Sequence, residues 1–221
     1  MLYIVATPIG NLDDITFRAI EVLKNADVIL CEDTRETLKL LNHLGISKRL
    51  VSYYRDNERV RMKEALSMLL EGREVALVCD RGTPGISDPA YLLVREAYRH
   101  NVQVCPVPGP SSLTAALSVC GLPTDRVCFY GFVPRKSGRK RKFLEALKER
   151  EETTVFYESV HRIMDTLSVM NELYPEREMT VCRELTKKFE EIKTGPVREI
   201  FAGYREKNAK GEFVVILKGS E

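Results

Sequence analysis

Short apolar runs and amphipathic stretches alternate along the first half of the chain. The runs at 2–6, 28–31 and 75–79 are unbroken apolar or aromatic residues, the pattern of strands buried on both faces. Between them, stretches such as 15–26 and 34–45 carry apolar residues at the spacing of an amphipathic helix. The alternation predicts repeated strand–helix units, and therefore parallel strands covered by helices on both faces of a sheet.

This pattern breaks near residues 121–126 and then restarts. The second half is expected to hold strands at 126–132, 153–159, 178–185 and 212–219, with helices at 138–150 and 161–174. We therefore predict an α/β protein of two αβα domains, residues 1–120 and 121–221. Because the linker is short, the two domains are expected to pack together and leave a ligand cleft between them.

Composition limits the classes of protein to consider. A formal net charge of +2 in 221 residues means that any nucleic-acid site must be a local patch. No apolar run approaches the roughly 20 residues of a membrane span, and the first residues lack the charged region of a signal peptide. The six cysteines form no CxxC pair and have no histidine at metal-ligand spacing. These features predict a cytoplasmic protein with reduced, mostly buried cysteines, no metal and no membrane partner.

The most unusual loop, residues 80–88, follows the apolar run at 75–79. It is longer than a strand-to-helix connection needs, and ligands of open α/β proteins bind at the carboxyl ends of strands. Gly82 permits close approach of a ligand to the backbone, and Asp80 and Thr83 could hold a polar ligand group. Asp88, directly before a proline, is instead expected to cap the helix that follows.

Other strand ends also carry polar groups. The segment 7–11, TPIGN, is neither a GxGxxG nor a GK[ST] motif, which argues against a classical dinucleotide-binding Rossmann site. Glu32, Asp33 and Arg35 form a charged cluster after the run at 28–31. Either Asp33 or Thr34 caps a helix there with Arg35 in solvent, or the cluster faces a substrate. The two serines of PGPSS, residues 108–112, likewise either cap a helix or bind an anionic group such as a carboxylate.

A basic run, residues 135–142, lies in the second half. It is either a solvated surface or an RNA-binding loop, and the glycine and serine within it suggest that the loop is mobile. Its six cations are Arg135, Lys136, Arg139, Lys140, Arg141 and Lys142.

Taken in order, these motifs carry a resemblance that covers residues 7 to 217. They are TPIGNL, CEDTR, CDRGTPGISDP, PGPSS, GFVPRKSGRK, FYESVHR, RELTKKFE and KGEFVVIL. Together they resemble the tetrapyrrole methylase superfamily, and GTPGISDP and FYES are most similar to its branch that acts on ribosomal RNA. The chain departs from the family at Arg81, usually a small residue, and at Ala90, usually glycine. Family members also often continue beyond the position of Glu221, so docking of the substrate would differ if that tail takes part.

The resemblance implies a fold, a cofactor, a partner and a reaction. It implies two αβα domains with S-adenosylmethionine in the cleft between them, a homodimer, and 2′-O-methylation of a cytidine in 16S rRNA of the small ribosomal subunit. The cofactor contacts that it implies are Pro8, Gly82, Thr83, Ile86, Ser111 and Ser112, with Tyr157, Glu158, Gly211 and Glu212 as further members.

The chemistry of this transfer narrows the roles of the charged residues. A 2′-hydroxyl is a poor nucleophile at neutral pH, so the protein must position it and help to remove its proton. The candidates for that role are Glu32, Asp33, Glu158 and Lys187. Arg35, which we group with the catalytic residues, would hold a phosphate that flanks the reacting group, as would Arg162 and Arg183. Two other functions remain open: methylation of a small tetrapyrrole precursor, and RNA binding without catalysis.

Overall fold

The computed structural model describes residues 1–205 and 210–220, so Glu221 lies outside the described residues. Contacts between Cα atoms divide the chain into two compact units, Met1–Ser111 and Ser112–Glu221. The boundary expected near residue 120 is therefore one helix too late. Helix α5 (Ser112–Val119) packs against strand β10 (Glu212–Leu217), and the Thr180 hydroxyl donates a hydrogen bond to the Cys120 carbonyl, so this helix belongs to the second unit.

The first unit is built on a parallel sheet of five strands in the order β3-β2-β4-β1-β5. Its strands are β1 (Leu2–Val5), β2 (Val28–Cys31), β3 (Leu50–Ser52), β4 (Val75–Leu77) and β5 (Val104–Val107). In the centre of the sheet Leu2 pairs with Val75 on one side and with Val104 on the other. The apolar runs thus form the buried parallel strands that the sequence predicts.

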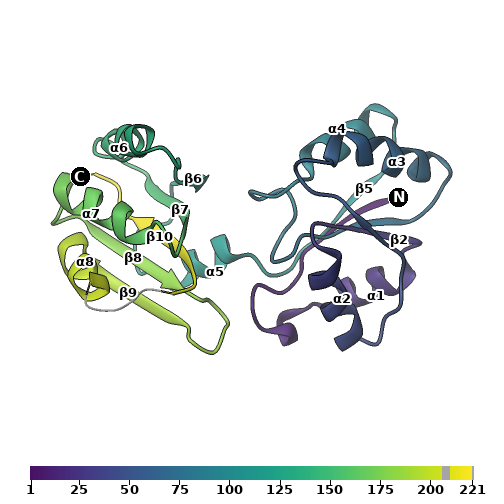
Figure 1. Cartoon of the computed structure of the whole chain (residues 1–221), viewed down its shortest axis with the longest axis horizontal. Coiled ribbons are helices and arrows are strands. Elements are labelled where there is room, and N and C mark those ends of the chain that lie inside the picture. Colours follow the sequence, from purple (N-terminus) through teal and green to yellow (C-terminus); the bar gives the residue numbers. More distant parts are fainter. Residues whose placement is uncertain (206–209, 221) are drawn as a thin grey trace. The chain divides into compact units, whose positions relative to one another are not determined.

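Helices cover both faces of this sheet. They are α1 (Phe17–Asn25), α2 (Thr34–His43), α3 (Glu58–Leu70) and α4 (Tyr91–Arg99), with a short 3₁₀ turn at Leu12–Asp14. In Figure 1, α3 and α4 lie on one side of the strands and α1 and α2 on the other. Neighbouring residues of β2 point to opposite faces, since Leu30 packs in the α3–α4 core and Ile29 in the α1–α2 core. Burial on both faces explains why these strands read as unbroken apolar runs.

The helix ends follow local sequence in most places. Thr16 caps α1 by accepting a hydrogen bond from the Ala19 amide, and Gly45 after α2 adopts a left-handed conformation with φ of +66°. The predicted cap at Asp88 is wrong. Helix α4 begins at Tyr91 with Ala90 at its N-cap position and no side chain bonded to its first amides.

The second unit has a mixed sheet in the order β6-β7-β10-β8-β9. Its other strands are β6 (Val127–Phe132), β7 (Thr153–Ser159), β8 (Glu178–Arg183) and β9 (Glu191–Pro196). Only β6 and β7 are parallel to each other; the remaining neighbours are antiparallel. Three helices, α6 (Ser137–Ala146), α7 (Ile163–Leu173) and α8 (Val197–Arg205), pack on one face, and α5 lies on the other (Figure 1). The core of this unit joins Leu144, Leu167 and Ile200 of the helices to Phe156 and Val181 of the sheet.

The sequence analysis predicts neither β9 nor α8 of the second unit. The helix predicted at 138–150 is confirmed by α6, which begins at Ser137. Most of the basic run is therefore helical, and the prediction that Ser137 and Gly138 form a mobile loop is wrong. This fixes which of its cations face solvent.

The cysteine prediction agrees with the structure. All six cysteines are free thiols, and Cys31, Cys79, Cys120 and Cys182 are buried. Burial raises the pKa of Cys31 to about 11 and that of Cys182 to about 12, as expected of inert core thiols. Within the described part of the chain, no helix combines the length and the apolar character needed to cross a membrane.

Candidate functional site

Three loops of the first unit are bonded together at the carboxyl edge of its sheet. Thr7, after β1, exchanges two backbone hydrogen bonds with Gly82, at 2.8 and 3.0 Å. The Thr7 hydroxyl also donates to the Cys79 carbonyl at 3.1 Å. The Thr83 hydroxyl donates to the Pro110 carbonyl at 3.1 Å. The three sequence motifs TPIGN, CDRGTPGISDP and PGPSS are therefore neighbours in space.

Glycine at position 82 is required by this junction. Its φ of +85° disfavours other residues, and a Cβ atom there would lie 3.3 Å from Ile9 Cγ2. Its amide and carbonyl are both bonded to Thr7, so Gly82 shapes the loop and offers no free amide to a ligand. Nearby, Pro8 is buried, Thr83 is half-buried and Ile86 is 37% exposed.

Asp33 is the cap of helix α2 and the partner of Arg35. Its carboxylate accepts hydrogen bonds from the Arg35 amide at 2.8 Å and from the Arg35 guanidinium at 2.6 and 3.1 Å. These bonds lower the pKa of Asp33 to about 2, which makes it a poor proton acceptor at neutral pH. The Arg35 side chain is 85% exposed, so the capping interpretation of this pair is confirmed.

Three other carboxyl groups at this edge repel one another. Burial raises the pKa of Glu32, and the charges of Asp88 and Asp80 raise it further. Burial is also the main cause of the raised pKa of Asp80 and of Asp88. The cations Arg55 and Arg81 lie near enough to offset part of this effect. Among the described residues, none forms a hydrogen bond or ion pair with the Glu32 side chain, so its carboxylate is available to a ligand.

Glu158, in the second unit, is a structural residue. Its side chain is fully buried and accepts hydrogen bonds from the Ser159 amide at 2.8 Å and the Thr166 hydroxyl at 2.7 Å. Its third partner is the Arg162 guanidinium, at 2.7 Å. Arg162 also donates to the Ser159 hydroxyl and to the Val133 carbonyl. The expectations that Glu158 removes a proton and that Arg162 holds an RNA phosphate are therefore corrected, because each group is committed to the other.

Ser112 and Tyr157 are brought together, as both belong to the second unit. The Ser112 hydroxyl at the start of α5 donates to the Tyr157 hydroxyl at 2.9 Å. The Tyr157 ring meets Phe129 and Phe132 edge-on, with ring centroids 5.0 and 5.5 Å apart. Ser111 is the last residue of the first unit.

The predicted residues after β8 form a network of ion pairs. Lys187 Nζ lies 2.8 Å from a Glu184 oxygen and 2.7 Å from a Glu212 oxygen. Gly211 has a φ of +109°, and a Cβ there would overlap the Glu184 side chain. Arg183 pairs with Glu191 at 3.2 Å and donates to the Lys210 carbonyl, so little of its guanidinium remains for a phosphate.

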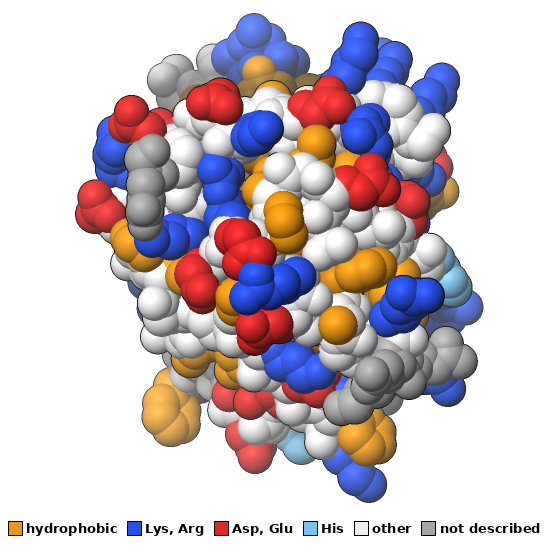
Figure 2. Space-filling model, turned by 90° about the vertical axis from the view of Figure 1, so that its left-hand side faces the viewer, with side chains coloured by type: hydrophobic (Ala, Val, Ile, Leu, Met, Phe, Trp, Pro, Cys, Tyr) orange, Lys and Arg blue, Asp and Glu red, His pale blue; other side chains and the backbone are white. Residues whose placement is uncertain are grey.

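The basic run divides into free and engaged cations. Within the described residues, four exposed cations have no ion-pair partner: Arg135, Lys136, Arg139 and Lys142. Arg141 pairs with Glu145 and Glu172. Lys140 is only 3% exposed and pairs with Asp165 at 2.6 Å, so its predicted RNA contact is corrected. Figure 2 shows several Lys and Arg side chains along the top of the view.

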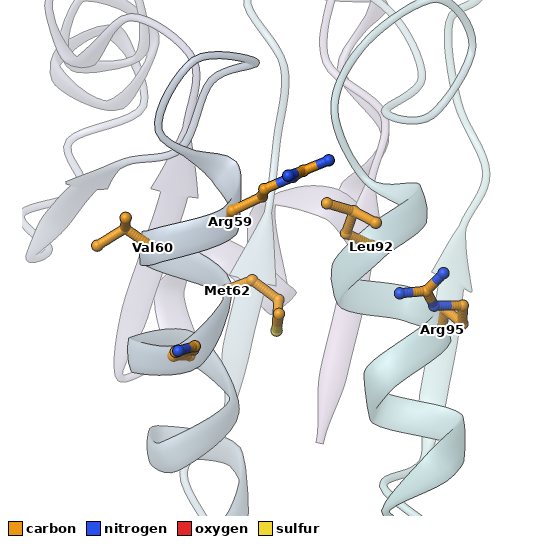
Figure 3. A pocket seen from close by; sticks show the side chains of 6 residues that line it. Arg59, Val60, Met62, Leu92 and Arg95 are labelled. Atoms are coloured by element: carbon orange, nitrogen blue, oxygen red, sulfur yellow. The ribbon is translucent and has the colours of Figure 1, made fainter.

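A hollow of about 600 Å³ lies between α3 and α4, outside the predicted site. It is lined by Arg59, Val60, Met62, Lys63, Leu92 and Arg95. Figure 3 shows Arg59 on α3 and Arg95 on α4 on its two walls. Arg95 is held by Glu96 at 3.1 Å and by the Tyr91 ring. Sequence reasoning missed this hollow because it arises only from the packing of two helices. The described residues also contain no group of three or more His, Cys, Asp or Glu side chains able to hold a metal ion.

Comparison with known proteins identifies the family. The model of the Tetrapyrrole (Corrin/Porphyrin) Methylases matches residues 1–200. The chain is 46% identical over 220 residues to a Thermotoga maritima protein named ribosomal RNA small subunit methyltransferase I, covering 100% of this chain and 99% of that one. A protein of the same name from Halalkalibacterium halodurans is 48% identical over 99% of this chain and 76% of its own length.

A solved structure supports the fold independently. The structure of a cobalamin biosynthetic enzyme, cobalt precorrin-4 methyltransferase, matches 98% of this chain and 94% of its own with a TM-score of 0.72. Its sequence is only 20% identical, so this likeness concerns the fold. The chain belongs to the tetrapyrrole methylase family and, within it, to the group of the ribosomal RNA small subunit methyltransferases I.

Proposed function

We propose that this protein transfers a methyl group from S-adenosylmethionine to the 2′-oxygen of a cytidine in 16S rRNA of the small ribosomal subunit. The observation that carries the proposal is the likeness, along the whole chain, to proteins named for methylation of small-subunit rRNA. The separate parts of the proposal rest on the geometry of each unit.

The first unit is suited to a cationic cofactor. S-adenosylmethionine carries a sulfonium and an ammonium group, and Glu32, Asp80 and Asp88 form a mutually repelling, partly desolvated acidic cluster. A cation beside these groups would relieve their repulsion and favour their charged forms. When bound, the cofactor supplies the methyl group. We place Pro8, Asp80, Thr83, Ile86 and Ser111 around it, with Gly82 holding the loop in shape, and Ser112, Tyr157 and Gly211 as proposed contacts from the second unit.

Glu32 is our candidate for the proton acceptor. Burial raises its pKa above that of an ordinary glutamate, and its carboxylate forms no hydrogen bond or ion pair with the described residues. Asp33 is held ionised by Arg35, and Glu158 is buried against Arg162, so neither suits the role. Lys187 remains a candidate for positioning substrate, through its ion pairs with Glu184 and Glu212.

The RNA contacts that we propose are on the second unit. The four free cations Arg135, Lys136, Arg139 and Lys142 can each neutralise a backbone phosphate, which makes binding sensitive to salt. Arg35 on the first unit is equally exposed to solvent and stays a proposed phosphate contact. Arg183 and Arg141 are engaged in ion pairs and would contribute less.

We further propose that the protein is a cytoplasmic homodimer, as the family resemblance implies. The six free cysteines suit a reducing compartment. Sedimentation equilibrium at micromolar concentration tests the dimer: a mass near twice the 25.2 kDa of one chain supports it.

Methyl transfer from radiolabelled cofactor tests the function. The acceptors are intact small subunits lacking the modification, naked 16S rRNA, and a tetrapyrrole precursor as control. We expect label in the ribosomal RNA, in one or both of its forms. Label in the tetrapyrrole alone would establish the competing methylase function. Cofactor binding without transfer to any acceptor would favour a binding module.

A further inference from the structure

The turn that joins β8 to β9, residues 184–190, has an unusual backbone. Glu184 and Thr186 have φ of +52° and +64°, in the left-handed region that side chains other than glycine rarely adopt. The Lys187 amide bonds to the Glu184 carbonyl at 3.0 Å, and the Glu190 amide bonds to the Lys187 carbonyl at 3.0 Å. The Glu190 carboxylate in turn accepts from the Thr186 amide. Strained residues persist where their surroundings fix them, and they cluster at binding and functional sites.

Side chains outside the turn hold it further. Glu184 is fixed by Lys187 and by the Glu212 amide, at 2.8 and 3.0 Å. It packs against Gly211, where any Cβ would overlap it. The backbone of the turn is therefore tied both to itself and to the start of β10.

This braced turn presents Phe189 to solvent. The Phe189 side chain is 65% exposed, although burial of a phenylalanine would stabilise the fold. Lys188 lies beside it, with Nζ 5.7 Å from the ring centroid. Among the described residues, no acidic side chain pairs with Lys188. Glu184 and Glu212 are already paired with Lys187, and Glu190 with the Thr186 amide, so Lys188 is the uncompensated charge next to the ring.

We propose that Phe189 is a stacking platform for one unpaired base of the RNA substrate, with Lys188 on the adjoining phosphate. This inference rests on the proposed function for the identity of the partner. Unpaired bases are recognised by stacking on aromatic side chains, and a neighbouring cation adds attraction to the backbone. A rigid turn loses little conformational freedom when the base binds, which suits a residue that positions substrate.

The stacking signal is measured directly with a short single-stranded oligoribonucleotide that contains 2-aminopurine. Stacking on an aromatic ring quenches the fluorescence of this base. We expect quenching by the wild-type protein, loss of quenching with Phe189→Ala, and recovery with Phe189→Trp. The dissociation constant of Phe189→Ala should rise about 5- to 150-fold, since base–aromatic stacking contributes about 1–3 kcal/mol. Tyr98→Ala removes an aromatic ring of matched exposure, 63%, and should behave as wild type.

Two outcomes would overturn the inference. In the first, the wild-type protein does not quench the fluorescence. In the second, Phe189→Ala quenches the fluorescence and binds the oligoribonucleotide as well as the wild type does. A Phe189→Ala protein that changes its sedimentation without RNA would show that the ring is a contact between copies of the chain.

Methyl transfer measured on the same samples keeps the two proposals separate. If the wild type does not methylate small subunits but quenches the fluorescence, and Phe189→Ala does not quench it, the proposed function is wrong and the stacking platform stands. A wild type that methylates, with a Phe189→Ala variant unchanged in KM for RNA, would remove the platform alone. Where the wild type methylates, Phe189→Ala should leave the KM for S-adenosylmethionine unchanged.

Discussion

The Asp33 amide donates a hydrogen bond to Asp80 Oδ1 over 2.9 Å, which joins the carboxyl end of β2 to that of β4. This bond places the helix cap of α2 beside the long loop at 80–88. It also holds Asp80 near Glu32, so two carboxyl groups from different strands share one partly buried environment. The acidic cluster is thus a consequence of the parallel sheet order, in which β2 and β4 are neighbours.

The first prediction concerns the stability cost of this cluster. Burial is the main cause of the raised folded-state pKa of Asp80. As the pH rises through that pKa, the carboxylate becomes charged in a partly buried place, and the folded protein loses stability. Asp80→Asn removes this cost, and the amide oxygen can still accept the bond from Asp33. We expect the melting temperature at pH 7 to rise by about 2 °C, with no difference near pH 3. Differential scanning fluorimetry from pH 3 to 8 measures this.

A control for that experiment is Asp56→Asn, which alters an exposed carboxylate before α3. It should leave the melting temperature unchanged at every pH. A lower melting temperature of Asp80→Asn at pH 7 would contradict the proposed cost.

The second prediction concerns cofactor affinity and pH. Because the pKa values of Glu32, Asp80 and Asp88 are raised, these groups lose their protons at higher pH than usual, and only the charged forms attract a cation. The affinity for S-adenosylmethionine should therefore increase as the pH rises through these values and then level off. Calorimetric titration from pH 4.5 to 8 measures it. Asp80→Asn should weaken binding at pH 7 by about 3- to 10-fold, as expected for loss of one partly screened charge interaction. Equal affinity across the pH range would exclude an electrostatic role for the cluster.

The third prediction separates the free cations of the basic run from the buried one. Replacing Arg139 or Lys142 with alanine should lower the slope of log affinity against log salt by about 0.7 each for single-stranded RNA. Lys140→Ala should leave that slope unchanged, since the ammonium is buried against Asp165. It should instead lower the free energy of unfolding by about 1–3 kcal/mol, through lost packing and a lost ion pair. Filter binding at several salt concentrations and urea unfolding give both quantities. A reduced salt slope for Lys140→Ala would place its side chain on the RNA after all.

The fourth prediction compares two glutamates that the sequence alone does not distinguish. Glu158→Ala would remove the fully buried acceptor of the Thr166 hydroxyl, the Ser159 amide and the Arg162 guanidinium, so the free energy of unfolding should fall by about 1–3 kcal/mol. Glu32→Gln should change stability little, but it should lower kcat about 10²- to 10⁴-fold if Glu32 removes the proton. Single-turnover methylation and urea unfolding, measured on both variants, test the assignment. Wild-type turnover by Glu32→Gln would remove it from the mechanism.

The sequence predicted the first unit well, because β1, β2 and β4 are apolar runs and because α1, α2 and α4 each have a clear apolar face. The second unit was harder. Strand β9 alternates between half-buried and exposed residues and exposes Ile192, so it is not an apolar run. The apolar residues Val197, Ile200 and Tyr204 do have helical spacing, but the sequence analysis does not include this helix. Burial of all three marks α8 as a core helix.

The sequence predicted which loops form the candidate site, but it did not predict the roles of several side chains in it. That TPIGN, GTPGISDP and PGPSS meet follows from strand ends in a parallel sheet. The engagement of Glu158 by Arg162, and the burial of Lys140 against Asp165, depend on partners from other elements. Asp88 resembled a helix cap because a proline follows it, yet it lies with Cys79 and Glu32 at the end of the sheet. Local sequence does not report such tertiary partners.

The most direct test of the central claim is the chemical identity of the product. Small subunits lacking the modification are incubated with the protein and S-adenosylmethionine that carries a deuterated methyl group. Their 16S rRNA is then digested to nucleosides and analysed by mass spectrometry. Our account predicts deuterated 2′-O-methylcytidine as the labelled nucleoside. A label on a base, or none on the RNA while a tetrapyrrole acceptor is methylated, would contradict it.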